Sequence, residues 1–185
     1  DVHLVCSKTV AQTAPIELGR SLPDVLEGLA STAGGGRLKV FAPDEFTSPL
    51  ASGSARGGPL VIVPCSMGTV GRIVAGTSET LLLRAADVCL KERRPLIVVA
   101  RETPLATHHL ANLTRLSELG ALVMPAAPGF YHRPRQVSDL VDFIVQRVPE
   151  RLRLLGVAIA VRAVQAVEVV SQARDSILEV ERIRM

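Results

Sequence analysis

Residues 59–64, Pro-Leu-Val-Ile-Val-Pro, and residues 95–100, Pro-Leu-Ile-Val-Val-Ala, decide the fold class of this chain. Both are continuous apolar runs rich in β-branched residues, and neither alternates between apolar and polar positions. Such runs are typical of strands that are buried on both faces, as in a parallel sheet covered by helices. Three further strands are predicted, over residues 2–6, 38–41 and 121–124.

Helical patterns separate these strands. The spacing of apolar residues predicts a weak helix region over 9–31, interrupted by Pro15 and Pro23, and helices at about 68–91, 106–119 and 137–148. The alternation of strands and helices predicts an α/β architecture, a three-layer Rossmann-like fold with a parallel sheet.

The C-terminal residues carry a different pattern. After Pro149, valines recur near helical spacing at positions 157, 161, 164 and 167, which indicates a long helix. We therefore expect one domain over residues 1–148 and a C-terminal helical extension over residues 149–185.

The composition excludes several classes of protein. The chain has 185 residues, of which 48% are hydrophobic and 21% charged, so a disordered chain is excluded. The net charge is +3 and there are five aromatic residues, too few for the stacking platform of a nucleic-acid binder. No apolar run approaches the ~18 residues of a membrane span, and no signal sequence opens the chain, so a cytoplasmic location is expected. The three widely spaced cysteines are interpreted as buried free thiols, without a metal site.

Polar or glycine-containing segments follow three of the predicted strands, at residues 64–69, 101–104 and 125–134. Ligands bind at the carboxyl ends of the strands in such sheets. In the first segment, Ser66, Gly68 and Thr69 suit an anion at a helix N-terminus, and an ordinary helix cap by Ser66 or Thr69 is equally compatible.

The other two segments also have two interpretations. Arg101 suits a phosphate or a flavin carbonyl and Glu102 could relay a proton, whereas the alternative is a surface ion pair that caps the next helix. The third segment holds the single tyrosine, Tyr131, beside His132, and an exposed loop histidine is more often without a site role.

Taken together, three stretches closely resemble the flavin prenyltransferase (UbiX) family: residues 64–69 (PCSMGT), residues 82–105 (LLRAADVCLKERRPLIVVARETPL) and residues 119–148, which include PAAPGFYHRP and VSDLVDFIVQRV. The resemblance is nearly continuous from about residue 59 to residue 147 and looser back to residue 2. It implies a Rossmann-like flavoprotein that joins a dimethylallyl group from dimethylallyl monophosphate to reduced FMN without a metal. The prenylated FMN would then serve a partner decarboxylase, for example in ubiquinone biosynthesis.

The resemblance also implies roles for individual residues. The cofactor contacts would be Ser7, Ser66, Met67, Gly68, Thr69 and Arg101. The substrate phosphate would be held by Lys91, Tyr131 and Arg147, with Arg84 reaching in from a neighbouring subunit. Glu102 would handle protons beside the flavin, so that Glu102, Lys91 and Tyr131 form the catalytic set. A large homo-oligomer, commonly a dodecamer, is implied as well.

The resemblance begins at the second strand of the family pattern. The family's first strand and its Gly-x-(Ser/Thr)-Gly-Ala-Ser-Gly loop, which receives the FMN phosphate, have no counterpart in these 185 residues. Two other functions therefore stay open: a non-catalytic flavin-binding or assembly subunit, and a related flavoprotein decarboxylase.

Overall fold

The computed structural model describes residues 2–32 and 38–155. Two compact units are present. One spans residues 42–127, and the other combines residues 2–32 and 38–41 with residues 128–155. Each unit is described here by itself.

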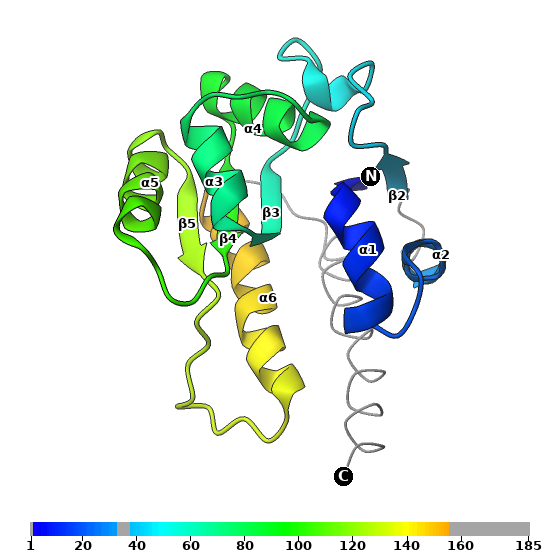
Figure 1. Ribbon diagram of the computed structural model, residues 1–185, viewed down its shortest axis with the longest axis vertical. Coiled ribbons are helices and arrows are strands. Elements are labelled where there is room, and N and C mark those ends of the chain that lie inside the picture. The colour runs from blue at the N-terminus through cyan, green and yellow to red at the C-terminus, as the bar shows by residue number, and fades with distance from the viewer. Residues whose placement is uncertain (1, 33–37, 156–185) are drawn as a thin grey trace. The chain divides into compact units, whose positions relative to one another are not determined.

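The unit over residues 42–127 is built on a parallel three-stranded sheet in the order β3-β4-β5 (Figure 1). Val61 pairs with Ile97 and Ile97 with Leu122, and the register of β3 against β4 shifts between Ile62 and Cys65. Helix α3 contacts both α4 and α5, α4 contacts β3 and β4, and α5 contacts β5. The elements are β3 (Leu60–Cys65), α3 (Met67–Val74), α4 (Leu81–Lys91), β4 (Leu96–Ala100), α5 (Thr107–Glu118) and β5 (Leu122–Pro125), preceded by the 3-10 turn η1 (Pro49–Ala51).

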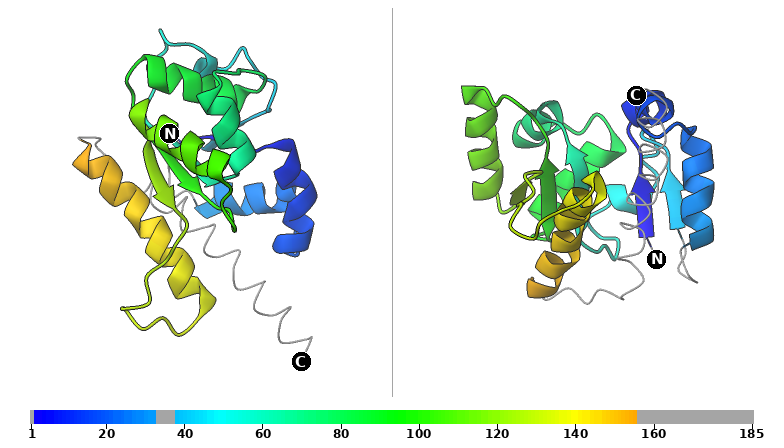
Figure 2. Two further views of the ribbon diagram at one scale, coloured as in Figure 1. Left: turned by 60° about the vertical axis from the view of Figure 1, so that its left-hand side comes forward. Right: turned by 90° about the horizontal axis from the view of Figure 1, so that it is seen from below.

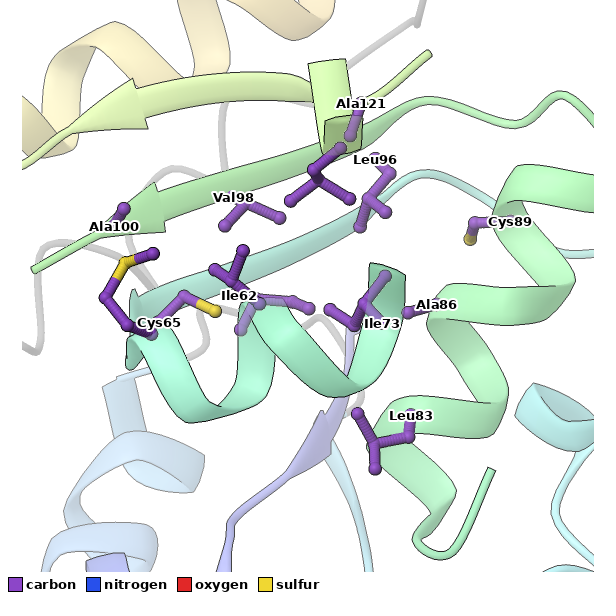
Figure 3. Packing of buried hydrophobic residues seen from close by; sticks show 13 residues of the cluster. Ile62, Cys65, Ile73, Leu83, Ala86, Cys89, Leu96, Val98, Ala100 and Ala121 are labelled. Carbon is purple, nitrogen blue, oxygen red and sulfur yellow. The ribbon is translucent and has the colours of Figure 1, made fainter. Parts of the chain in front are cut away.

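The core of this unit lies around β4, whose five side chains are all buried. Figure 3 shows Val98 and Leu96 of β4 facing residues of α3 and α4, among them Ile73 and Ala86. Because neighbouring residues of β4 point to opposite faces and all are buried, both faces of this strand are covered, as the apolar run predicts. The same prediction is wrong for β3, in which Val63 is 43% exposed.

The predicted helix at about 68–91 is wrong as a single element, because it is two helices. Gly76 adopts a left-handed conformation, with φ of +72°, and ends α3. Thr80 then begins α4, its Oγ1 accepting a hydrogen bond from the Leu83 N–H at 3.4 Å. The helical spacing of apolar residues continues across both helices, although Gly76 ends the first and Thr80 begins the second. The spacing alone therefore predicts one helix.

The other unit contains the parallel pair β1 (Val2–Val5) and β2 (Leu38–Phe41), which lie side by side in the right-hand view of Figure 2. Helices α1 (Lys8–Glu17) and α2 (Leu22–Thr32) lie between them in sequence. Pro15 does not interrupt α1, because the helix continues past it with a bond from the Leu18 N–H to the Ala14 carbonyl. Pro23 stands in the first turn of α2, where a missing N–H costs no helical bond. The break comes instead at Gly19, with φ of +63°.

Helix α6 (Val137–Leu154) also belongs to this unit and is longer than the predicted 137–148. It continues through Pro149, so the predicted boundary between residues 148 and 149 lies inside a helix. The long helix predicted from the valines at 157–167 lies outside the described residues, and the domain division stays a prediction. Parallel strands connected by helices confirm the α/β class.

Candidate functional site

The first two polar segments, and the first residues of the third, meet at the carboxyl end of the sheet in the 42–127 unit. The Arg101 N–H donates to the Cys65 carbonyl at 3.1 Å, and the Ala126 N–H donates to the Ala100 carbonyl at 2.9 Å. These bonds continue the β3-β4-β5 ladder beyond the strands. Residues after each strand are therefore neighbours, as expected for a ligand site at this edge.

Ser66 is the N-cap of α3. Its Oγ accepts a hydrogen bond from the Thr69 N–H at 3.3 Å and lies 3.1 Å from Thr69 Oγ1. In the described part of the chain, no acceptor is recorded for the N–H groups of Met67 and Gly68, the first two of the helix. A Cβ on Gly68 would find nothing closer than 3.9 Å. The cap interpretation is thus confirmed, and donors suited to a flavin's polar atoms stay available beside it.

Two apolar residues anchor this turn. The Met67 side chain is buried in the core, so the residue's expected contact with FMN stays a prediction that its backbone N–H could meet. Cys65 is also buried, and burial raises the pKa of its thiol to about 12. Its Sγ donates weakly to the Ser66 carbonyl. Cys65 is therefore a neutral packing residue under the turn and not a nucleophile.

Arg101 and Glu102 are exposed at the same edge of the sheet. Within the residues that the structure describes, neither side chain takes part in an ion pair. The alternative, an ion pair of these two residues that caps the next helix, is not formed. At the start of that helix, α5, the Ala106 N–H donates instead to His109 Nδ1. Both side chains are therefore unengaged, and the backbone of Arg101 lies against Cys65, the residue before the Ser66 turn.

Tyr131 and Arg147 are brought together in the other unit. Arg147 Nη2 donates to the Tyr131 hydroxyl at 3.4 Å, and its guanidinium lies 4.9 Å from the centre of the Phe143 ring. Tyr131 packs edge-on against Phe143, with ring centres 5.8 Å apart, and His132 stacks on the same ring at 5.3 Å. Tyr131 remains 76% exposed. A phenol and a guanidinium held in this way can receive a phosphate.

Sequence reasoning missed Phe143, the ring shared by this cluster. Its spacing of four from Arg147 on α6 is a signal that could have found it, since residues four apart share a helix face. The cluster borders a surface hollow of about 490 Å³, also lined by Arg133, Arg135, Asp139 and Asp142.

Arg84 and Lys91 lie on α4. Arg84 Nη1 pairs with Asp87 at 2.7 Å, the local pair that its spacing suggests, and Lys91 pairs with Glu92. Because α4 leads into the start of β4 whereas Arg101 follows its end, Lys91 and Arg101 lie at opposite ends of this strand. From residue 95 to residue 101 the strand path covers about 20 Å. One copy of this unit therefore does not bring Lys91, an expected phosphate contact, next to Arg101, an expected cofactor contact.

Ser7, the remaining expected cofactor contact, is the N-cap of α1, where its Oγ accepts from the Val10 N–H at 3.4 Å. Its contact with FMN stays a prediction. Among the described residues, no group of three or more His, Cys, Asp or Glu side chains is placed to hold a metal ion. Within the same residues, none of the helices has the length and apolar character needed to cross a membrane.

Comparison with known proteins identifies relatives along most of the chain. A family model described as Flavoprotein matches residues 1–149. The flavin prenyltransferase UbiX of Pseudomonas aeruginosa is 42% identical over 163 residues, which cover 85% of this chain and 77% of that protein. The UbiX of Thermoplasma acidophilum is 45% identical, with 85% and 81% covered.

Solved structures agree. A UbiX protein crystallised with FMN and dimethylallyl pyrophosphate matches with a TM-score of 0.72 and 37% identity, covering 84% of this chain and 77% of that one. A protein of Escherichia coli O157:H7 described as a dodecameric FMN-dependent UbiX-like decarboxylase matches with a TM-score of 0.70 and 37% identity, covering 84% and 79%.

Proposed function

This chain belongs to the flavoprotein family, and we propose that it acts there as a flavin prenyltransferase, joining the dimethylallyl group of dimethylallyl monophosphate to reduced FMN. One observation carries the proposal. The Ser66 turn, with its available donors, lies beside the unengaged side chains of Arg101 and Glu102 at the carboxyl edge of β3-β4-β5. That edge belongs to a chain more than 40% identical to flavin prenyltransferases.

The residues of this edge fit a flavin. The Ser66 and Thr69 hydroxyls and the N–H groups of Met67 and Gly68 offer neutral donors, and Arg101 offers a charged one. Such donors suit the carbonyl and phosphate oxygens of FMN. Ser7 would supply a further hydroxyl. Reduced FMN, when bound, supplies the electron-rich ring that accepts the prenyl group.

The cations have a different task. Breaking the allylic C–O bond leaves negative charge on the departing phosphate, which fixed positive groups stabilise. Arg147, hydrogen-bonded to Tyr131, would hold that phosphate, and Lys91 and Arg84 would add charge to it. Glu102, a carboxylate without an ion-pair partner in the described chain, would accept or return the proton exchanged during ring closure.

The position of Lys91 supports a site shared between copies. Since Lys91 and Arg101 lie at opposite ends of β4, a second copy is the natural source of the Lys91 and Arg84 at each site. We therefore place the activity in a homo-oligomer, with a dodecamer as the expected assembly. A decarboxylase that uses prenylated FMN would receive the product, and the cytoplasm is the expected location.

The test begins with an FMN titration of this 185-residue chain, followed by a transfer assay with reduced FMN and dimethylallyl monophosphate or the pyrophosphate. We expect saturable FMN binding and formation of prenylated FMN. Absence of FMN binding would contradict catalysis by this chain and favour the non-catalytic family member.

Replacing Glu102 by Gln removes the proposed proton acceptor without a change in size. We expect product formation to slow by roughly a hundredfold or more, with FMN affinity unchanged. Glu118→Gln, which removes a carboxylate from an exposed pair with Arg115, is the matched control and should keep the parent rate. Equal turnover of Glu102→Gln and the parent would remove Glu102 from the mechanism.

A second candidate function is decarboxylation, because two matching structures are described as decarboxylases, one of them a phenylacrylic acid decarboxylase of Aquifex aeolicus at 32% identity. The same assay separates the two functions. Release of carbon dioxide from an aromatic acid by the FMN-loaded chain alone would favour the decarboxylase, whereas prenylated FMN without such release supports the transferase.

A further inference from the structure

The chain reverses direction at the end of α4, and this reversal places the Arg94 guanidinium against residues 53–55. Arg93 is left-handed, with φ of +53°, and the N–H groups of Arg93 and Arg94 donate to the carbonyls of Leu90 and Cys89 at 3.2 and 2.8 Å. This is the bonding pattern of a Schellman helix end, which satisfies the last carbonyls of the helix. The chain reverses there, and Arg94 is half-buried against the segment that follows η1.

Two arginines hold that segment by its backbone. Arg94 Nη2 donates to the carbonyls of Gly53 and Ala55 at 2.6 and 2.8 Å. Arg84 Nε donates to the carbonyl of Ala51 at 3.0 Å. Three alternate carbonyls of residues 51–55 are thus bound to side chains more than thirty positions later in the sequence. Charge-assisted bonds of this kind hold a loop more firmly than neutral ones.

The segment so held lies directly against Lys91. A Cβ atom built on Gly53 would lie 2.5 Å from Lys91 Nζ and would also overlap Oε1 of Glu92. Any side chain at position 53 would therefore displace the Lys91–Glu92 pair. Both overlapping atoms are at the ends of flexible side chains, so the displacement moves the ammonium at little cost to the fold.

We propose that residues 51–55, held by Arg84 and Arg94, are a positioning element for the Lys91 ammonium, and that Gly53 sets where this charge stands. The inference rests on the proposed function, in which Lys91 binds the prenyl phosphate. It adds two positioning residues, Gly53 and Arg94. Glu92 is the local counter-ion of the ammonium. Gly53 has no side chain, so the Lys91–Glu92 ion pair can lie directly against its backbone.

The first experiment tests the contact without substrate. Acylation rates of the lysine amines are measured by peptide mass spectrometry in the parent, Gly53→Ala and Gly58→Ala, with Lys8 and Lys39 as internal references. Gly58 is the matched control, because a Cβ there meets nothing within 4 Å. We expect Gly53→Ala alone to raise the Lys91 rate several-fold as the ion pair loosens. An unchanged acylation rate of Lys91 in Gly53→Ala would contradict the proposal that Gly53 positions the ammonium.

The second experiment tests the role in binding. In the transfer assay we expect Gly53→Ala to raise the KM for dimethylallyl monophosphate by roughly tenfold, with kcat, FMN affinity and Tm close to the parent. Gly58→Ala should match the parent throughout. Arg94→Met should raise the same KM, and Arg94→Lys, which can still donate to one carbonyl, should recover part of the loss.

The Lys91→Met variant distinguishes the substrate role of Lys91 from the positioning role of Gly53. If Lys91→Met raises KM and Gly53→Ala adds nothing in that background, Gly53 acts through Lys91. If Lys91→Met raises KM and Gly53→Ala alone does not, the positioning role is overturned while the proposed function stands. If Lys91→Met leaves KM unchanged, the substrate role of Lys91 falls, and the positioning role with it, whatever the acylation rates.

Discussion

Cys65 illustrates how one residue supports the site without taking part in its chemistry. It ends β3, its side chain is 1% exposed, and its carbonyl accepts the bond from Arg101 that brings the ends of β3 and β4 together. The neighbouring Ser66 is exposed and caps α3. Consecutive residues thus have separate tasks: the buried thiol of Cys65 packs in the core, and the exposed hydroxyl of Ser66 is the one proposed to contact a ligand.

The buried thiol predicts a pH dependence of stability. The pKa of Cys65 rises from 9.0 in the unfolded chain to about 12 in the fold. Between these values the unfolded chain loses the proton that the folded chain keeps, so the free energy of unfolding falls as pH rises above about 9, and the contribution is complete below it.

The contribution of one such proton approaches about 1.4 kcal/mol per pH unit. Urea unfolding of the parent and Cys65→Ala at several pH values from about 8 to 10.5 measures it. The variant loses stability at every pH, since a cavity opens, but its decline with pH should be shallower than the parent's. Parallel curves would contradict the assignment.

The elements α3 and α4 show why the break between helices matters. Helix α3 begins at the Ser66 turn and α4 carries Arg84 and Lys91, so one continuous helix could not supply both groups at their observed places. Gly76 ends α3 in the left-handed region, and a Cβ there would find nothing within 4 Å. A substitution at Gly76 therefore tests backbone conformation alone.

We expect Gly76→Ala to lower the free energy of unfolding by about 1–2 kcal/mol, because an L-residue pays this cost in the left-handed region. Gly76→Asn should lose less, since asparagine tolerates that conformation. Urea denaturation measures both, with Gly58→Ala as the control that retains the parent stability. Equal stability of Gly76→Ala and the parent would show that the turn relaxes to another conformation.

The separation of Lys91 and Glu102 bears on the assembly in which the proposed site would form. Lys91 precedes β4 and Glu102 follows it, so the two residues are separated by the length of the strand. In the proposed function, a site that uses both residues would take them from different copies. The matching protein of Escherichia coli O157:H7 is described as dodecameric, which is consistent with such an assembly.

Mixing two inactive variants tests this requirement. Lys91→Met and Glu102→Gln chains are co-expressed with different tags, and mixed oligomers are purified through both. With random assembly, about a quarter of the sites would then hold both native residues and recover transferase activity. Oligomers of either variant alone are the controls. Mixed oligomers no more active than these controls would show that one copy supplies both residues.

Local sequence patterns were enough to predict the strands, the α/β class and the segments after β3 and β4 that carry the candidate site. These features depend on local patterns: continuous apolar runs, and polar residues at the strand ends. The N-cap of Ser66 was also within reach, because capping involves residues three apart. A helix boundary inside an apolar pattern, as at Gly76, was harder to predict, since apolar spacing continues across it.

Contacts between residues distant in the sequence could not be predicted in this way. Lys91 and Arg101 lie at opposite ends of β4, and the Lys91–Glu92 pair lies against Gly53. Phe143 contacts both Tyr131 and Arg147, which are hydrogen-bonded to each other. The bonds from Arg84 and Arg94 to residues 51–55 span 33 to 41 positions. Such contacts follow from how packed elements meet, and no local pattern of residues encodes them. A residue's type fixes the chemistry of its side chain, whereas the packing of the whole fold determines which residues become its neighbours.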